Sequence, residues 1–87
     1  MTTLERHEIF REIMTSDRWT ESEKWVLKAQ LKRAGGFASA LWQCFALADE
    51  ANFAQLSLGF PEQAAAFLSW RHGDLADRFR AAGVEEI

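Results

Sequence analysis

Two helix-start signals near the beginning of the chain most strongly constrain its fold. Thr2 stands three residues before Glu5, and Thr20 stands three residues before Glu23. This is the capping-box spacing, in which a hydroxyl and a carboxylate satisfy backbone N–H groups that the first helical turn leaves free. Apolar residues at helical spacing follow each pair. The spacing therefore predicts two helices that begin at these threonines.

The ends of these two helices are also marked in the sequence. Polar residues at 15–17 end the first helix. Gly35 and Gly36 follow the second helix. We expect them to close it with positive φ angles, which glycine adopts at little cost.

A third helix is expected from Phe37, and its two apolar faces predict a place at the centre of the fold. Asn52 either breaks this helix or occupies a polar position within one helix that reaches Leu58. The pattern leaves both interpretations open.

Proline and glycine delimit the C-terminal part of the chain. Pro61 suits the first turn of a fourth helix, which Gly73 ends. Asp74 is placed to cap a fifth helix that Gly83 stops. No alternating apolar run predicts a strand. We therefore expect one all-α domain over residues 1–87, folded as a compact bundle of four or five short helices.

Aromatic residues supply the expected core. The chain has 87 residues with four tryptophans and seven phenylalanines, and each ring can bury roughly 150–250 Å². A chain this short needs most of its rings inside. The rings predicted to form the core are Trp42, Phe45, Phe53, Phe60, Phe67 and Trp70. Helices with two apolar faces leave further surface for a partner or a second copy.

Cys44 is the only cysteine, so no disulfide can form within the chain. An unpaired thiol fits a reducing compartment, and we expect an intracellular, cytoplasmic protein. Cys44 lies in an apolar stretch without a nearby basic residue, which predicts a buried, structural thiol. The first residues lack a signal-peptide pattern, and no apolar run approaches roughly 18 residues, so no membrane association is expected.

No residue pattern predicts an enzyme. His7 and His72 each lack a nearby group that could position them for acid–base catalysis. Arg11 stands four residues after His7, where a zinc-binding helix would need its second histidine. We expect neither catalysis nor a metal or other cofactor.

The charges divide unevenly along the chain. Residues 1–36 carry seven basic and six acidic groups, whereas residues 37–87 carry three basic and seven acidic groups. Between Arg33 and Arg71 there is no lysine or arginine. The acidic side chains predicted to bind a partner are Asp49, Glu50, Glu62, Asp74 and Asp77.

The glycine turn before Phe37 permits a helix-turn-helix interpretation. The helix after the turn has no basic residue to meet a polyanion, so we do not expect direct nucleic-acid binding. A basic edge on the preceding helix is interpreted as a solvated face, and a small DNA-binding regulator is the least favoured alternative. This edge consists of Lys24, Lys28, Lys32 and Arg33.

The stretch from Ala46 to Gly83 resembles short reading frames of phages and prophages, in which an Ala-Asp pair, an Asn, a Leu, a Phe-Pro and a Trp precede Gly-Asp-Leu. The matching residues are Ala48, Asp49, Asn52, Leu56, Phe60, Pro61, Trp70, Gly73, Asp74 and Leu75. The resemblance implies a phage or mobile-element context. Small acidic proteins from that context often block a host protein, and anti-CRISPR proteins are similar in size and charge.

The charge pattern and the resemblance together predict an inhibitor that binds a host nucleic-acid-handling complex, most concretely an anti-CRISPR that blocks a basic surface of a Cas protein. Carboxylates compete with phosphates for basic groups, and salt weakens both interactions. Binding through helix faces and aromatic anchors stays open, as does a homodimeric inhibitor. The alternative is a homo-oligomeric structural or accessory protein of a phage.

Overall fold

Helices account for the regular structure in the computed structural model, which describes residues 2–87. They run in the order α1 (Thr3–Thr15), α2 (Glu21–Gln30), α3 (Gly36–Leu47), α4 (Glu50–Gly59), α5 (Pro61–His72) and α6 (Leu75–Ala81). The all-α class is confirmed, although the described residues form six helices rather than four or five. Within this part of the chain, no helix is long and apolar enough to cross a membrane.

Both predicted capping boxes form. At α1, the Glu5 N–H donates to Thr2 Oγ1 (3.2 Å) and the Thr2 N–H donates to Glu5 Oε1 (3.2 Å). At α2, the Glu23 N–H donates to Thr20 Oγ1 (3.1 Å) and the Thr20 N–H donates to Glu23 Oε1 (2.9 Å). Hydrogen bonds between close neighbours in the chain therefore determine where these helices begin.

The end of α2 differs from the prediction. Lys32 occupies the left-handed region with a φ of 58°, whereas Gly35 has a φ of −70° and precedes α3, whose first residue is Gly36. The N–H groups of Lys32 and Arg33 donate to carbonyl oxygens of the last turn of α2 (3.2 and 2.8 Å), as in a Schellman motif. The Arg33 guanidinium then lies 4.4 Å from the ring centre of Phe10 on α1. The prediction that the two glycines close α2 is wrong, because the chain turns before it reaches them.

The segment from Phe37 to Leu58, for which the sequence left open a break at Asn52, forms two helices. Ala48 has an extended conformation (φ −68°, ψ 134°) and separates α3 from α4. Asp49 caps α4, since its carboxylate accepts a hydrogen bond from the Asn52 N–H (2.8 Å). Asn52 therefore lies inside α4, and the break three residues earlier produces the additional helix.

The C-terminal helices begin and end at the predicted proline and glycine residues. α5 begins at Pro61 and ends before Gly73, and Gly83, with a φ of 106°, follows α6. Asp74 occupies the cap position of α6, but its carboxylate pairs with Arg78 (3.4 Å to Nε) rather than with the backbone. The predicted position of this helix start is confirmed, while the hydrogen bond expected there is replaced by an ion pair.

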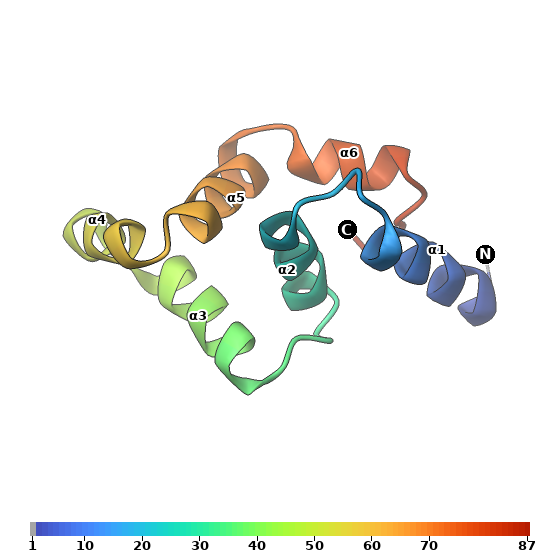
Figure 1. The fold of residues 1–87 in the computed structure, drawn as a ribbon, viewed down its shortest axis with the longest axis horizontal. Helices are drawn as coiled ribbons and strands as arrows, with labels where there is room; N and C mark the ends of the chain where they lie inside the picture. The colour runs from blue at the N-terminus through green and yellow to red at the C-terminus, as the bar shows by residue number, and fades with distance from the viewer. Residues whose placement is uncertain (1) are drawn as a thin grey trace.

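The core forms around α2, which lies in the middle of the molecule with α3 and α4 on one side and α1 and α6 on the other (Figure 1). Val26 and Leu27 of α2 are fully buried. Trp25 donates its indole N–H to Ala38 O of α3 (3.0 Å), which ties the two helices together. α2 packs on α3 and α5, and α5 packs in turn on α4 and α6.

The prediction that the third helix occupies the centre of the fold is wrong, because α3 lies beside the core. Its buried residues are Leu41 and Phe45, because only one of its two apolar faces meets α2 and α5. The predicted aromatic core is confirmed: Phe45 and Phe67 are buried and stacked, with ring centroids 5.6 Å apart. The other predicted rings are partly buried and pack against this core, namely Trp42, Phe53, Phe60 and Trp70.

Candidate functional site

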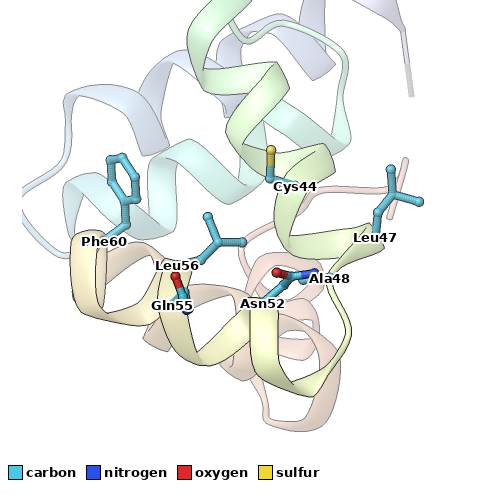
Figure 2. Close-up of a pocket in the computed structure, with 8 residues that line it drawn as sticks. Cys44, Leu47, Ala48, Asn52, Gln55, Leu56 and Phe60 are labelled. Atoms are coloured by element: carbon cyan, nitrogen blue, oxygen red, sulfur yellow. The ribbon is translucent and has the colours of Figure 1, made fainter.

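An open groove between α3 and α4 is the candidate site (Figure 2). Its volume is about 510 Å³. The residues that line it are all uncharged: Cys44, Leu47, Ala48, Asn52, Gln55, Leu56, Gly59 and Phe60. Most of this lining is apolar, and two side-chain amides provide hydrogen-bonding groups. Such a lining suits an apolar ligand surface that carries a few polar groups.

The groove stays open because α4 is attached to the body through a small part of its surface. The Phe53 ring packs against Phe45 of α3 (5.5 Å between centroids) and Phe67 of α5 (6.0 Å). Leu56 is partly buried against the core. Every residue of α4 keeps part of its surface exposed. The side of α4 that faces away from α5 is therefore available for contact.

Two apolar side chains at the groove are unusually exposed. Leu47, which lines it, is 83% exposed, and Phe37 is 73% exposed. The Phe37 ring lies 6.2 Å from that of Phe60, so it extends the apolar area from the groove towards the start of α3. We call the groove residues together with Phe37 the α3–α4 surface. Leu58 of α4 is 86% exposed but is not part of the lining. Sequence patterns alone missed the exposure of Leu47, because a leucine in an apolar helix is expected to face the core.

Cys44 lines this groove and is exposed, so the prediction of a buried thiol is wrong. The buried face of α3 is defined by Leu41 and Phe45. Cys44 precedes Phe45 by one residue, which rotates it by about 100° around the helix. An apolar stretch of sequence did not reveal which of two neighbouring residues faced the core.

The five acidic candidates occupy the first turns of three successive helices. Asp49 caps α4, Glu50 is its first residue, and Glu62 is the second residue of α5. Asp74 and Asp77 belong to the start of α6. Acidic groups are stabilised at helix N-termini by the helix dipole. This structural role accounts for the acid-only composition of the middle of the chain.

These five side chains do not form one surface. Asp49 and Glu50 directly follow the lining residue Ala48 in the chain. Asp77 is paired with Arg80 (2.8 Å), as Asp74 is with Arg78. Asp49 and Glu50 are therefore the candidates placed beside the groove.

Glu62 lies elsewhere, in a second hollow of about 460 Å³ between α5 and the start of α2. Glu21 and Glu23 line the same hollow. Glu23 also bonds Arg78 of α6 (2.6 Å). Burial alone would raise the pKa of Glu23, but the hydrogen bond from the Thr20 backbone and the Arg78 guanidinium outweigh it and lower the pKa. This acidic cluster therefore includes a structural ion pair that joins α2 to α6.

The basic edge of α2 is only partly solvated. Lys24 is buried, with its Nζ 3.4 Å from a carboxylate oxygen of Glu21, so its prediction as a solvated residue is wrong. Lys28 is partly exposed, and Lys32 and Arg33 are exposed, although the Arg33 guanidinium lies over the Phe10 ring. Lys24 is therefore the member of this edge that departs from the predicted solvated face.

The histidines lie on separate helices. His7 is exposed on α1, and His72 is the exposed last residue of α5. Within residues 2–87, no three His, Cys, Asp or Glu side chains are gathered as they are around a metal ion.

Comparisons with protein-family models, curated proteins and solved structures found no match for this chain. The resemblance of residues 46–83 to phage reading frames therefore stays a prediction.

Proposed function

We propose that this chain is a non-catalytic protein-binding domain and that it binds its partner through the α3–α4 surface. The observation that carries this proposal is the uncharged groove with two strongly exposed apolar side chains, Leu47 in its lining and Phe37 against Phe60. Exposed apolar side chains that gather around a hollow are typical of interaction sites. Burial of such apolar surface is the dominant favourable contribution to most protein association.

Charge favours a partner with a basic surface. The chain has no lysine or arginine between Arg33 and Arg71, and Asp49 and Glu50 adjoin the groove. Basic groups on the partner would therefore meet attraction without nearby repulsion. Two copies of the chain joined through this surface would instead bring the same carboxylates together. A basic partner is accordingly preferred to a homo-oligomer.

The inhibitor of a host nucleic-acid-handling complex is a narrower form of this proposal. A basic surface that binds phosphates is one that Asp49 and Glu50 could cover. A Cas effector, implied by the phage resemblance, is the specific partner we propose to test. The apolar groove would contribute most of the affinity, because two carboxylates beside it are a weak substitute for a nucleic-acid backbone.

Capture from bacterial lysate with matched variants tests the proposal. The wild type, the variant Phe37→Gln/Leu47→Gln and the control Leu4→Gln are compared. Leu4 is 67% exposed on α1, so its replacement removes a similar apolar side chain away from the groove. Captured proteins are identified by mass spectrometry, and a purified candidate, with a Cas effector included, is titrated by calorimetry.

We expect a partner that binds the wild type and Leu4→Gln alike and binds the double variant at least about tenfold more weakly, since each buried apolar anchor is worth more than about 1 kcal/mol. Equal binding by all three proteins would show that the α3–α4 surface is not the binding site.

A further inference from the structure

We infer that the α3–α4 groove receives one amphipathic helix of the partner, with an apolar stripe in the groove and lysine or arginine at the end near Asp49 and Glu50. This inference rests on the proposed function and specifies the occupant of the same surface. It follows from the spacing of the lining residues, from the hydrogen bonding of their backbone groups within the helices and from the position of the neighbouring charges.

The spacing of the lining residues matches a helix. On α4, the groove is lined by residues 52, 55, 56 and 59, which follow the i, i+3, i+4, i+7 spacing of one helix face. On the other wall, Cys44 and Leu47 lie three residues apart on α3, and Ala48 follows the end of that helix. Figure 2 shows the labelled side chains on the two helices and at their ends. Both walls are therefore formed mainly by helical side chains. A third helix can insert its own ridge between two such walls.

The backbone of the walls disfavours an extended peptide. A peptide bound as a strand needs free N–H and C=O groups along an edge. The groove is formed by α3 and α4, whose backbone groups are engaged along each helix. The occupant must therefore satisfy its own backbone, which a helix does and an extended chain does not.

The length of the groove sets the size of the apolar stripe. The α4 wall runs from Asn52 to Phe60, which corresponds to about 12 Å at 1.5 Å per residue. Two turns of a helix span that distance. We therefore expect three or so apolar anchors on the occupant, spaced i, i+3 or i+4, and i+7.

Charge sets which residues flank the stripe. The lining is uncharged, so a charged side chain inside the groove would lose its hydration without gaining a partner. Asp49 and Glu50 lie next to Ala48, at one end of the lining. A lysine or arginine beyond the anchors would reach these carboxylates and remain in contact with water.

Synthetic peptides of about 16 residues, long enough for partial helicity, test this inference on the full chain. The first carries a Leu stripe at helical spacing with lysine at both ends, the second has the same stripe with glutamate at both ends, and the third is the lysine peptide with a central proline. The readout is the rate at which Ellman's reagent modifies Cys44, the only thiol in the chain and part of the groove.

The expected result is that the lysine peptide slows modification of Cys44 about tenfold once its concentration is about ten times its Kd. The proline peptide should protect little, because proline interrupts the helix. The glutamate peptide should bind more weakly, and Asp49→Asn/Glu50→Gln should remove that difference between the two peptides. Protection should be lost in Leu47→Gln and kept in Leu4→Gln.

Equal protection by the proline peptide would overturn the helical occupant, and equal protection by the glutamate peptide would overturn the basic flank. Absence of protection by every peptide would overturn the whole inference. If binding of a partner protein still depended on Phe37 and Leu47, the proposed function would survive this failure. Dimerisation in sedimentation, with Cys44 already protected in the free protein, would assign the groove to a second copy instead.

Discussion

α2 and α4 use similar apolar side chains for opposite purposes. α2 buries Val26 and Leu27 completely, whereas every residue of α4 stays at least partly exposed and Leu58 is 86% exposed. α2 is surrounded by other helices, but α4 packs on α5 and borders an open groove. The difference shows that the position of a helix in the bundle, and not its apolar content, decides whether its side chains stabilise the fold or remain available for binding.

Removing a core ring should have the largest effect. Phe45→Ala is expected to destabilise the protein by about 3–5 kcal/mol, because Phe45 is fully buried among aromatic rings and a cavity would remain. Leu58→Ala, at the exposed end of α4, should change stability by less than about 0.5 kcal/mol. Urea unfolding followed by tryptophan fluorescence measures both. Similar losses for the two variants would break the contrast between core and surface.

The Glu23–Arg78 ion pair should make the α2 side of the molecule sensitive to acid. The folded state lowers the pKa of Glu23, so the pair stabilises the fold above the unfolded-state pKa of a glutamate, about 4.3. This contribution is lost as the pH falls through the lower folded-state pKa. Glu23→Gln, which can keep the capping box, should cost about 1.5 kcal/mol at neutral pH.

Urea unfolding at a series of pH values tests this effect. The loss of stability on acidification should be shallower for Glu23→Gln than for the wild type. Glu8→Gln is the control, since Glu8 is exposed on α1. A wild-type pH profile in Glu23→Gln would contradict the role given to this carboxylate.

Asp49→Ala should loosen α4 while leaving α2 intact. The change removes the cap that the Asn52 N–H uses (2.8 Å) and should cost about 1 kcal/mol. Hydrogen exchange is expected to accelerate at the start of α4 and to stay unchanged in α2. Asp49→Asn, which preserves a capping oxygen, should behave like the wild type, and faster exchange in both variants would point to charge rather than capping.

Lys32→Gly should have the smallest effect, with the opposite sign. Lys32 has a φ of 58°, which strains a residue with a side chain. Glycine should relieve this strain, although it also has more conformational freedom in the unfolded chain. The net effect should be a free energy of unfolding about 0.5 kcal/mol higher. Gly83, with a φ of 106° after α6, is the reverse control, because Gly83→Ala should be destabilising. A loss of stability in Lys32→Gly would contradict the strain.

The helix starts could be predicted because they depend on residues a few positions apart. Thr2 and Thr20 cap their helices as expected, and Pro61 begins α5. The break before α4 was harder to locate: the sequence analysis considered Asn52, whereas the cap is Asp49. Only the hydrogen bond from the Asn52 N–H to Asp49 identifies which residue caps the helix.

The candidate site was less predictable. The five acidic residues were predicted to bind a partner because of their charge alone. Charge does not reveal that Asp74 pairs with Arg78 and that Asp77 pairs with Arg80. The groove itself depends on how α4 docks through Phe53. No pattern within either helix carries that information.

The helical class, most helix boundaries and the aromatic character of the core could be predicted from the amino-acid sequence, because capping, glycine and proline effects and hydrophobic periodicity act over a few residues. Packing between helices determines that Cys44 is exposed and that Lys24 is buried. Both depend on which helices meet across the bundle. Burial is a property of contacts between distant parts of the chain, and local sequence constrains such contacts only weakly.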